Sequence, residues 1–224
     1  MYTIFLTEIN TDSGSYYVPN TLGFCTIILI ILLILLGIFY FTGKKATKYY
    51  NSKKLAFSSL AISLSTVCSY ISIIKMPMGG SITPFSMFFI ALIGYWFGLR
   101  TGLLSAIAFG CLQLCLNPYI IHPIQLIMDY ILAYGALGLS GIFYGKNNGL
   151  TTGYITGVLG RFVFSFLSGV VFFGSCAADY NMGVFLYSAC YNGLYLFGEM
   201  LLTLILLAIP SFKRALKVVE NQIT

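Results

Sequence analysis

The segment Asn117-Pro-Tyr-Ile-Ile-His-Pro-Ile-Gln-Leu-Ile-Met-Asp-Tyr130 begins with a polar, proline-containing turn and continues into a strongly apolar helix. That helix contains an acid, Asp129, in a stretch whose composition is typical of a membrane span. A carboxylate at bilayer depth is costly, so it is retained where it has a partner or faces a water-filled cavity. Asp129 is therefore a candidate binding residue.

Two further polar residues share a helix face with Asp129. His122, Gln125 and Asp129 are spaced i, i+3 and i+7, which places them in one stripe on an otherwise apolar helix. We interpret the stripe as one wall of a binding site. The alternative is a hydrogen-bond network that only packs helices together.

The composition of the whole chain indicates a membrane protein. Of its 224 residues, 58% are hydrophobic and 8% are charged, and the mean hydropathy is +0.91. Soluble domains are about half apolar and about one quarter charged. We therefore predict an all-α fold, a polytopic membrane helix bundle embedded in the lipid bilayer. The six cysteines lack CxxC spacing, and we interpret them as small core residues.

Seven apolar stretches are long enough to be considered as spans. The first, Leu22–Phe41, is almost unbroken Ile and Leu, and we interpret it as an anchor outside the site. A lysine-rich loop, 43–54, follows it. The other predicted spans are Leu55–Ile74, Pro84–Leu99, Thr101–Leu116, Pro123–Tyr144, Leu150–Phe173 and Phe185–Ile209.

The charges suggest an orientation in the membrane. With the N-terminus outside and the C-terminus in the cytoplasm, ten of the twelve basic residues fall on the inner side. These ten are Lys44, Lys45, Lys48, Lys53, Lys54, Arg100, Lys146, Lys213, Arg214 and Lys217. The formal charge of +6 is therefore explained by the orientation of the protein in the membrane, and we predict no nucleic-acid partner.

Small residues recur at a spacing of four, which lets helix backbones approach closely. They are Gly94 and Gly98, then Gly149, Gly153 and Gly157, and in the second span Ser59, Ala61, Ser63 and Ser65. The glycines predict a compact bundle. The serine-rich set predicts either internal packing or a docking surface for another membrane protein.

Other polar groups in the apolar stretches need partners. A buried Arg161 without a counter-charge would be costly, so we expect it to pair with Glu199 or with backbone carbonyls. The amide of Asn192 needs hydrogen bonds wherever it lies. The Gly-Gly loop in Lys75–Thr83 is flexible enough to cover a cavity.

Together these groups describe an outward-facing cavity with one acid, amide and hydroxyl groups, and several aromatic faces. Such a cavity suits a small, flat, polar or cationic organic molecule. A nucleotide-binding P-loop is absent, and the single histidine excludes a His-rich metal centre. We predict no enzymatic activity and no cofactor. An intramembrane enzyme or assembly factor stays an alternative, although no nucleophile and base set is evident.

Four motifs in order give the chain a family resemblance. They are Met76-Pro-Met-Gly-Gly-Ser81, Tyr119-x-x-His-Pro-x-Gln-x-x-x-Asp-Tyr130, Ser168-Gly-x-Val-Phe-Phe-Gly-Ser175 and Tyr187-Ser-x-x-Tyr-Asn192. Through them the chain resembles the thiamine-specific S component of energy-coupling-factor (ECF) transporters, over roughly residues 55–212. The resemblance implies a six-helix substrate-binding domain over 55–212. We predict that residues 1–54 comprise a polar segment, an additional transmembrane helix and the lysine-rich cytoplasmic loop, and that 213–224 form a cytoplasmic tail.

The resemblance also implies roles for individual residues. Asp129 matches the acid, usually Glu, that binds the aminopyrimidine of thiamine. The remaining implied site residues are Tyr119 and Tyr130 beside that acid, Tyr187 and Asn192 on the last span, and Gly79 and Gly80 in the covering loop. Ser165 stands where the family usually has His, and Phe173 where it has an aromatic residue. Ser in place of His, together with Asp in place of Glu, leaves thiamine, a precursor or another pyrimidine-like compound as the ligand.

The resemblance further implies capture of a vitamin from outside the cell membrane of a prokaryote. The partners would be an ECF transmembrane T subunit and two ATPase subunits, which supply the energy. The alternative is a stand-alone secondary carrier in which Asp129, Glu199 or His122 takes up and releases protons. Uptake that survives loss of the ATPases but requires a proton gradient would favour this alternative.

Overall fold

The computed structural model describes residues 6–11, 14–23, 26, 52–146 and 148–223. Most of the predicted N-terminal span 22–41 and most of the lysine-rich loop 43–54 lie outside the described residues. Near the N-terminus, strands β1 (Leu6–Thr11) and β2 (Gly14–Pro19) form an antiparallel hairpin in which Glu8 is opposite Tyr17. The all-α bundle thus carries a small β-hairpin in the polar segment that precedes it.

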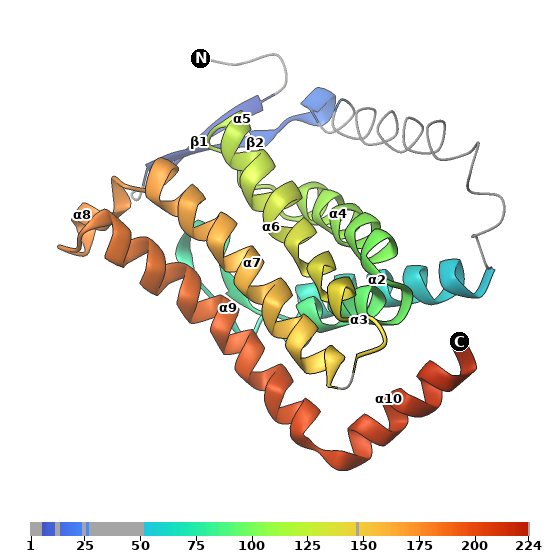
Figure 1. The fold of residues 1–224 in the computed structure, drawn as a ribbon. Coiled ribbons are helices and arrows are strands. Elements are labelled where there is room, and N and C mark those ends of the chain that lie inside the picture. Colours follow the sequence, from blue (N-terminus) through green and yellow to red (C-terminus); the bar gives the residue numbers. More distant parts are fainter. Residues whose placement is uncertain (1–5, 12–13, 24–25, 27–51, 147, 224) are drawn as a thin grey trace.

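The bundle follows the predicted order of helices (Figure 1). Its long helices are α2 (Ser52–Tyr70), α3 (Ser86–Phe97), α4 (Leu99–Leu116), a composite helix over Pro123–Phe143, α7 (Gly149–Phe172) and α9 (Val184–Ala208). The short helix α8 (Cys176–Asp179) links α7 to α9, and α10 (Pro210–Ile223) ends the chain. Among the described residues, α4, the composite helix, α7 and α9 are long and apolar enough to cross a membrane.

The two remaining predicted spans differ from these four. Helix α3 is apolar but has 12 residues, because Gly98 (φ +85°) ends it and at once starts α4. At 1.5 Å per residue, α3 is shorter than the hydrocarbon core of a bilayer. Helix α2 has 19 residues but is rich in serine. Gly98 is thus a turn residue and not the close-packing residue that its spacing from Gly94 predicted.

The predicted Gly94, Gly153 and Gly157 do lie at close helix contacts, and Gly102 and Gly138 are further examples. A Cβ on Gly102 would lie 2.6 Å from the Cα of Gly94, and one on Gly138 would lie 2.5 Å from the backbone nitrogen of Leu103. Cβ atoms on Gly153 and Gly157 of α7 would lie 2.8 and 3.0 Å from the carbonyl oxygens of Ser140 and Leu137. These glycine contacts and buried aromatic residues such as Phe88 and Tyr154 form one densely packed region of α3, α4, the composite helix and α7. We call this region the base. Because lipid is as apolar as the helices, such close packing is what holds the bundle together.

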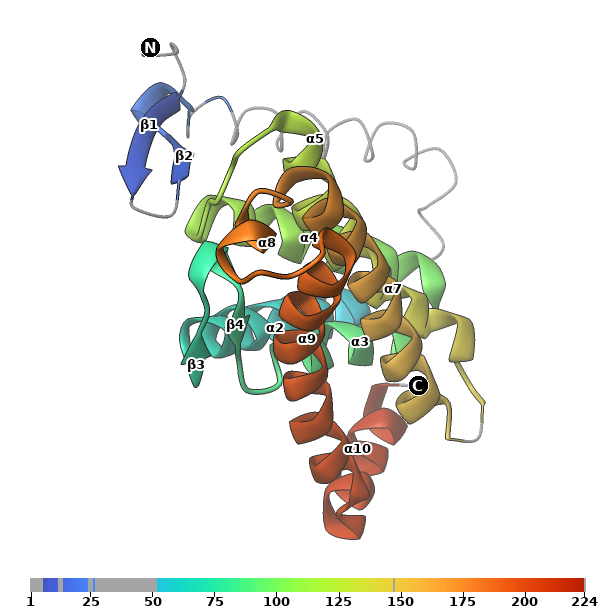
Figure 2. The ribbon, with the colours of Figure 1, turned by 90° about the vertical axis from the view of Figure 1, so that its left-hand side faces the viewer.

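The residues expected to form a tail are helical. In α10, Phe212, Leu216, Val219 and Ile223 recur at spacings of three and four and pack against the base. At the far end of α10, the ammonium group of Lys53 donates a hydrogen bond to the carbonyl of Gln222 at 3.3 Å. Seen from the second direction, α10 and the β-hairpin lie at opposite ends of the bundle (Figure 2).

The small residues of α2 divide into two faces. Ala61 and Ser65 are buried, and the Ser65 hydroxyl donates to the carbonyl of Ser86. Ser59 and Ser63 are exposed, and their hydroxyls donate to carbonyls of their own helix. One stripe is therefore internal packing, and the other is free to meet a partner.

Candidate binding site

The helix that carries Asp129 changes its winding at that residue. It starts as α5 (Pro123–Leu126), becomes the π-helical segment η2 (Ile127–Leu132), returns to α-helix in α6 (Ala133–Gly135) and tightens into the 3-10 segment η3 (Ala136–Phe143). Short π-helical segments are rare and often occur at functional sites. Here the segment places Asp129 on the wall of a cavity.

Gln125 organises the turn before this helix. Its side-chain nitrogen donates to Asp129 Oδ2 at 2.7 Å and to the carbonyl of Tyr119 at 3.1 Å. Its side-chain oxygen accepts from the backbone N–H of Ile121 at 3.2 Å. The amide is 2% exposed, so these bonds are made away from solvent and fix the carboxylate against the turn.

Tyr130 fixes the same turn from the other side. Its hydroxyl donates to the carbonyl of Asn117 at 2.7 Å and accepts from the backbone N–H of Tyr119 at 2.8 Å. The ring of Tyr119 then stacks on Phe173 with centroids 6.0 Å apart. Tyr130 thereby positions an aromatic face beside Asp129.

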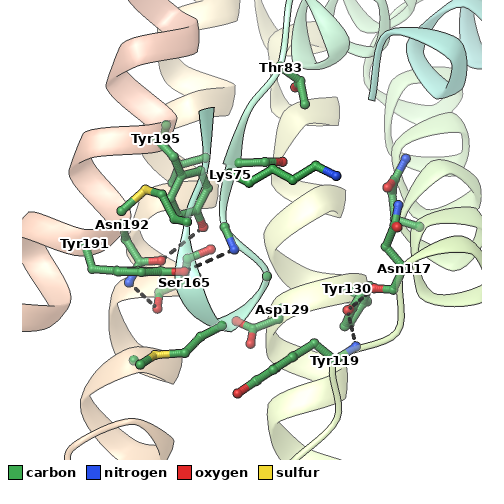
Figure 3. A pocket seen from close by; sticks show the side chains of 18 of the residues that line it. Lys75, Thr83, Asn117, Tyr119, Asp129, Tyr130, Ser165, Tyr191, Asn192 and Tyr195 are labelled. Atoms are coloured by element: carbon green, nitrogen blue, oxygen red, sulfur yellow. Dashed lines mark hydrogen bonds between the residues drawn. The ribbon is translucent and has the colours of Figure 1, made fainter. Parts of the chain in front are cut away.

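The cavity has a volume of about 730 Å³ and lies between the composite helix, α2, α4, α7, α9 and the Lys75–Thr83 loop. This volume is within the range that small-molecule sites occupy. Figure 3 shows Asp129 and Tyr119 on one wall and Ser165, Asn192 and Tyr195 on the opposite wall. The lining includes Tyr119, Gln125, Asp129, Tyr130, Ser165, Phe173, Tyr187, Asn192, Gly79 and Gly80, all of which the sequence predicted.

Asn192 is the polar centre of the α9 wall. Its amide nitrogen donates to the carbonyls of Ser165 and Ser188 at 3.2 and 3.0 Å. Its side-chain oxygen accepts from the hydroxyl of Tyr195 at 3.0 Å. The amide therefore ties α7 to α9 on the wall opposite Asp129.

The Lys75–Thr83 loop lines one side of the cavity. Strands β3 (Ile74–Lys75) and β4 (Ser81–Ile82) pair, and the 3-10 turn Pro77–Gly79 joins them. The hydroxyl of Tyr191 donates to the carbonyl of Pro77 and accepts from the backbone N–H of Gly80, the latter at 3.1 Å. A Cβ on Gly80 would lie 2.7 Å from that hydroxyl, so glycine permits this close contact.

The expected pair between Arg161 and Glu199 does not form. Glu199 accepts its hydrogen bonds from Thr83, Ser86 and Met87. The guanidinium carbon of Arg161 lies 3.9 Å from the centre of the Tyr134 ring, a cation–π contact. Within the described residues, no ion pair or hydrogen bond joins Arg161 to Glu199, although both line the cavity. The donors at the start of α3 satisfy Glu199 in place of the arginine.

His122 lies outside the cavity lining. Its backbone is extended (φ −148°, ψ 146°), so it precedes the helix and caps it by accepting from the N–H of Ile124 at 3.2 Å. Its exposed ring stacks on Phe172, with centroids 5.3 Å apart. The predicted placement of His122 in the polar stripe was wrong, because helical spacing applies only after the helix has begun.

The sequence analysis did not identify the α2–α4 wall. There the side chain of Gln113 donates to the hydroxyl of Ser69 at 2.8 Å, and both residues line the cavity. Gln113 is 4% exposed, and its position in an otherwise apolar span was the available signal. Lys75 also lines the cavity, from the loop.

Comparisons with known proteins agree with this geometry. Residues 55–219 match the model of the family described as thiamine transporter protein (Thia_YuaJ). The thiamine transporter ThiT of Bacillus subtilis (strain 168) is 33% identical over 150 residues, which cover 61% of this chain and 77% of that protein. A solved structure of ThiT from Listeria monocytogenes is similar in fold, with a TM-score of 0.63, 24% identity, and coverage of 73% of this chain and 95% of the other. The chain therefore belongs to the thiamine transporter protein family.

Proposed function

We propose that this multi-pass membrane protein is an S component that captures thiamine for uptake, and that the cavity beside Asp129 is where it binds. The observation that carries the assignment is the convergence of four separate sequence motifs on one cavity. Of the predicted site residues, all but His122 line it. Family membership supports thiamine as the substrate.

The chemistry of the cavity suits the two rings of thiamine. The carboxylate of Asp129 can accept hydrogen bonds from an aminopyrimidine, and Gln125 holds that carboxylate in place. The stacked faces of Tyr119 and Phe173 are suited to a flat cationic ring such as a thiazolium. The hydroxyls and amide around Asn192 supply the polar contacts of the opposite wall.

Calorimetry on the purified full-length chain in detergent tests this assignment with thiamine and with its two halves. We expect tight binding of thiamine and weak binding of the pyrimidine and thiazole halves, because each half leaves part of the cavity unfilled. Tight binding of one half alone would instead identify a carrier for a precursor. No heat with any of the three, from well-folded protein, would contradict thiamine as the ligand.

We infer from the family resemblance that an ECF T subunit and two ATPases drive the uptake. The exposed Ser59 and Ser63 face of α2 is the place to test docking, since Ala61 is buried in the bundle. Ser59→Leu with Ser63→Leu should leave thiamine binding intact and reduce ATP-dependent uptake in vesicles that contain all four subunits. Uptake without the ATPases that collapses with the proton gradient would favour a secondary carrier.

The orientation proposed from the charges places the loop over the cavity outside and α10 in the cytoplasm. The exposed basic residues Lys213, Arg214 and Lys217 of α10 agree with this orientation. A C-terminal epitope tag should be cleaved by added protease in inside-out vesicles and protected in right-side-out cells. Cleavage in intact cells would reverse the orientation.

A further inference from the structure

Glu199 is a buried acid whose only hydrogen-bond donors, within the described residues, belong to one short segment. The residue is 3% exposed and its carboxylate lines the cavity. Thr83 Oγ1 donates to one oxygen at 2.6 Å, while Ser86 Oγ and the backbone N–H of Met87 donate to the other at 3.0 and 2.7 Å. The side chain of Glu199 on α9 is thus bound to residues 83–87.

This segment is both the end of the covering loop and the beginning of α3. The N-cap residue Phe85 is in the left-handed conformation (φ +62°), and its side chain makes no cap bond. The first N–H groups of a helix lack partners in that helix and favour a nearby negative charge. Glu199 therefore supplies from α9 the cap that the loop itself lacks.

The tip of the loop is attached to the same helix by weaker bonds. Tyr191 contacts Pro77 and Gly80, and the hydroxyl of Tyr187 lies 3.4 Å from the sulfur of Met78. Thioether acceptors are weak, whereas hydrogen bonds to a carboxylate are the strong class. The tip is therefore held by neutral hydrogen bonds, whereas residues 83–87 are held by bonds to a carboxylate.

We propose that Glu199 is a positioning residue that anchors the hinge of the Lys75–Thr83 loop to α9 and thereby slows escape of the ligand from the cavity. The inference rests on the proposed capture of thiamine in this cavity. Glu199 does not need to touch the ligand in this role. It keeps the loop in the position from which Tyr191 and Tyr187 can hold the tip closed.

Glu199→Gln in the full-length protein tests the proposal, because the amide keeps the shape but loses one acceptor. We expect the dissociation rate constant of thiamine, measured by chase of labelled ligand, to rise about tenfold while the association rate constant changes less than about threefold. Thr83→Val should also raise the dissociation rate constant of thiamine, but by a smaller factor. Combined with Glu199→Gln, it should add less than its separate effect.

Thr203→Val is the matched control. Its hydroxyl donates to the backbone carbonyl of Glu199 at 3.0 Å and accepts from Tyr154, so it is an equally buried α9 contact outside the cavity lining. We expect it to lower the unfolding temperature without changing the dissociation rate constant. An equal rise in both variants, or none in Glu199→Gln, would overturn the proposal.

Hydrogen exchange separates this proposal from the assignment of the ligand. In ligand-free protein, Glu199→Gln should increase the exchange of the backbone amides of Met78–Thr83 relative to those of the base. That result would support the hinge anchor even if thiamine did not bind. If Glu199→Gln cannot be purified folded, Thr83→Val and Ser86→Ala serve in the same measurement, and unchanged exchange in both would contradict the anchor.

Discussion

The half of the bundle nearest α10 is packed backbone against backbone, whereas the Lys75–Thr83 loop beside the cavity is held by polar side chains. In the base, Gly94, Gly102 and Gly138 bring α3, α4 and η3 so close that an added methyl group would meet main-chain atoms. The Lys75–Thr83 loop and the start of α3 are instead joined to α9 by hydroxyl and carboxylate bonds, although Gly110 of α4 also lies against the main chain of Tyr130 beside the cavity. Backbone atoms in close contact fit together in only one arrangement. Hydrogen bonds to a loop, by contrast, can be replaced by bonds to water or to a ligand.

This difference suggests that the two parts of the protein have different roles. The base fixes the relative positions of α3, α4, η3 and α7, and so fixes two walls of the cavity. The loop depends on α9 through side chains alone, and it is the part that can open without disturbing the base. Substitutions should therefore have large effects on folding in the base and mainly affect binding around the cavity.

The largest effect is expected from Gly138→Leu. Its Cβ would lie 2.5 Å from Leu103 N, and backbone cannot yield as a flexible side chain can. Overpacking of this kind should lower the unfolding temperature by about 10 °C or more, or prevent recovery of folded protein. Fluorescence-detected size exclusion and thermal unfolding in detergent measure this.

Gly183→Leu is the control for Gly138→Leu, because a Cβ at Gly183 meets nothing within 4 Å and its φ is an ordinary −67°. It should purify and unfold like the parent chain. If both variants purified and unfolded like the parent chain, the base would not be the rigid part of the bundle.

The second largest effect is expected from Asp129→Asn. The substitution keeps the shape but removes the negative charge that would accept from an aminopyrimidine, so thiamine affinity should fall more than about tenfold. The unfolding temperature should stay close to that of the parent chain. Calorimetry and thermal unfolding on the same preparation measure both, and an unchanged affinity would exclude Asp129 from ligand contact.

A smaller effect is expected from Tyr130→Phe. Loss of the hydroxyl leaves the carbonyl of Asn117 and the N–H of Tyr119 without this partner, and the turn should loosen. We expect thiamine affinity to fall by roughly three- to tenfold, through misplacement of the Tyr119 ring. Affinity equal to that of the parent chain would show that the turn is held without Tyr130.

Much of this organisation follows from the sequence by simple rules. Apolar length predicted the helices to within a few residues, and helical spacing placed Gln125 and Asp129 on one cavity wall. The spacing of Phe212, Leu216, Val219 and Ile223 is typical of an amphipathic helix, but residues 213–224 were predicted only to be a tail.

Other features depend on tertiary contacts that a linear sequence does not contain. Opposite charges predicted a pair between Arg161 and Glu199, yet the start of α3 supplied the acid with closer donors. The cation–π contact of Arg161 requires that Tyr134 be known as its neighbour. The π-helical winding at Asp129 likewise has no local sequence signal that we could identify.

The smallest effect is expected from His122→Ala, which tests the boundary of the polar stripe. His122 caps the helix from an extended backbone and its exposed ring lies against Phe172, away from the cavity lining. Loss of the cap should cost about 0.5–1 kcal/mol of unfolding free energy, while thiamine affinity should change less than about twofold. Gln125→Ala on the same stripe should weaken binding more, because Gln125 bonds to Asp129 directly. A larger loss of affinity from His122→Ala than from Gln125→Ala would mean that the stripe begins one turn earlier and that the cavity extends to the histidine when ligand is bound.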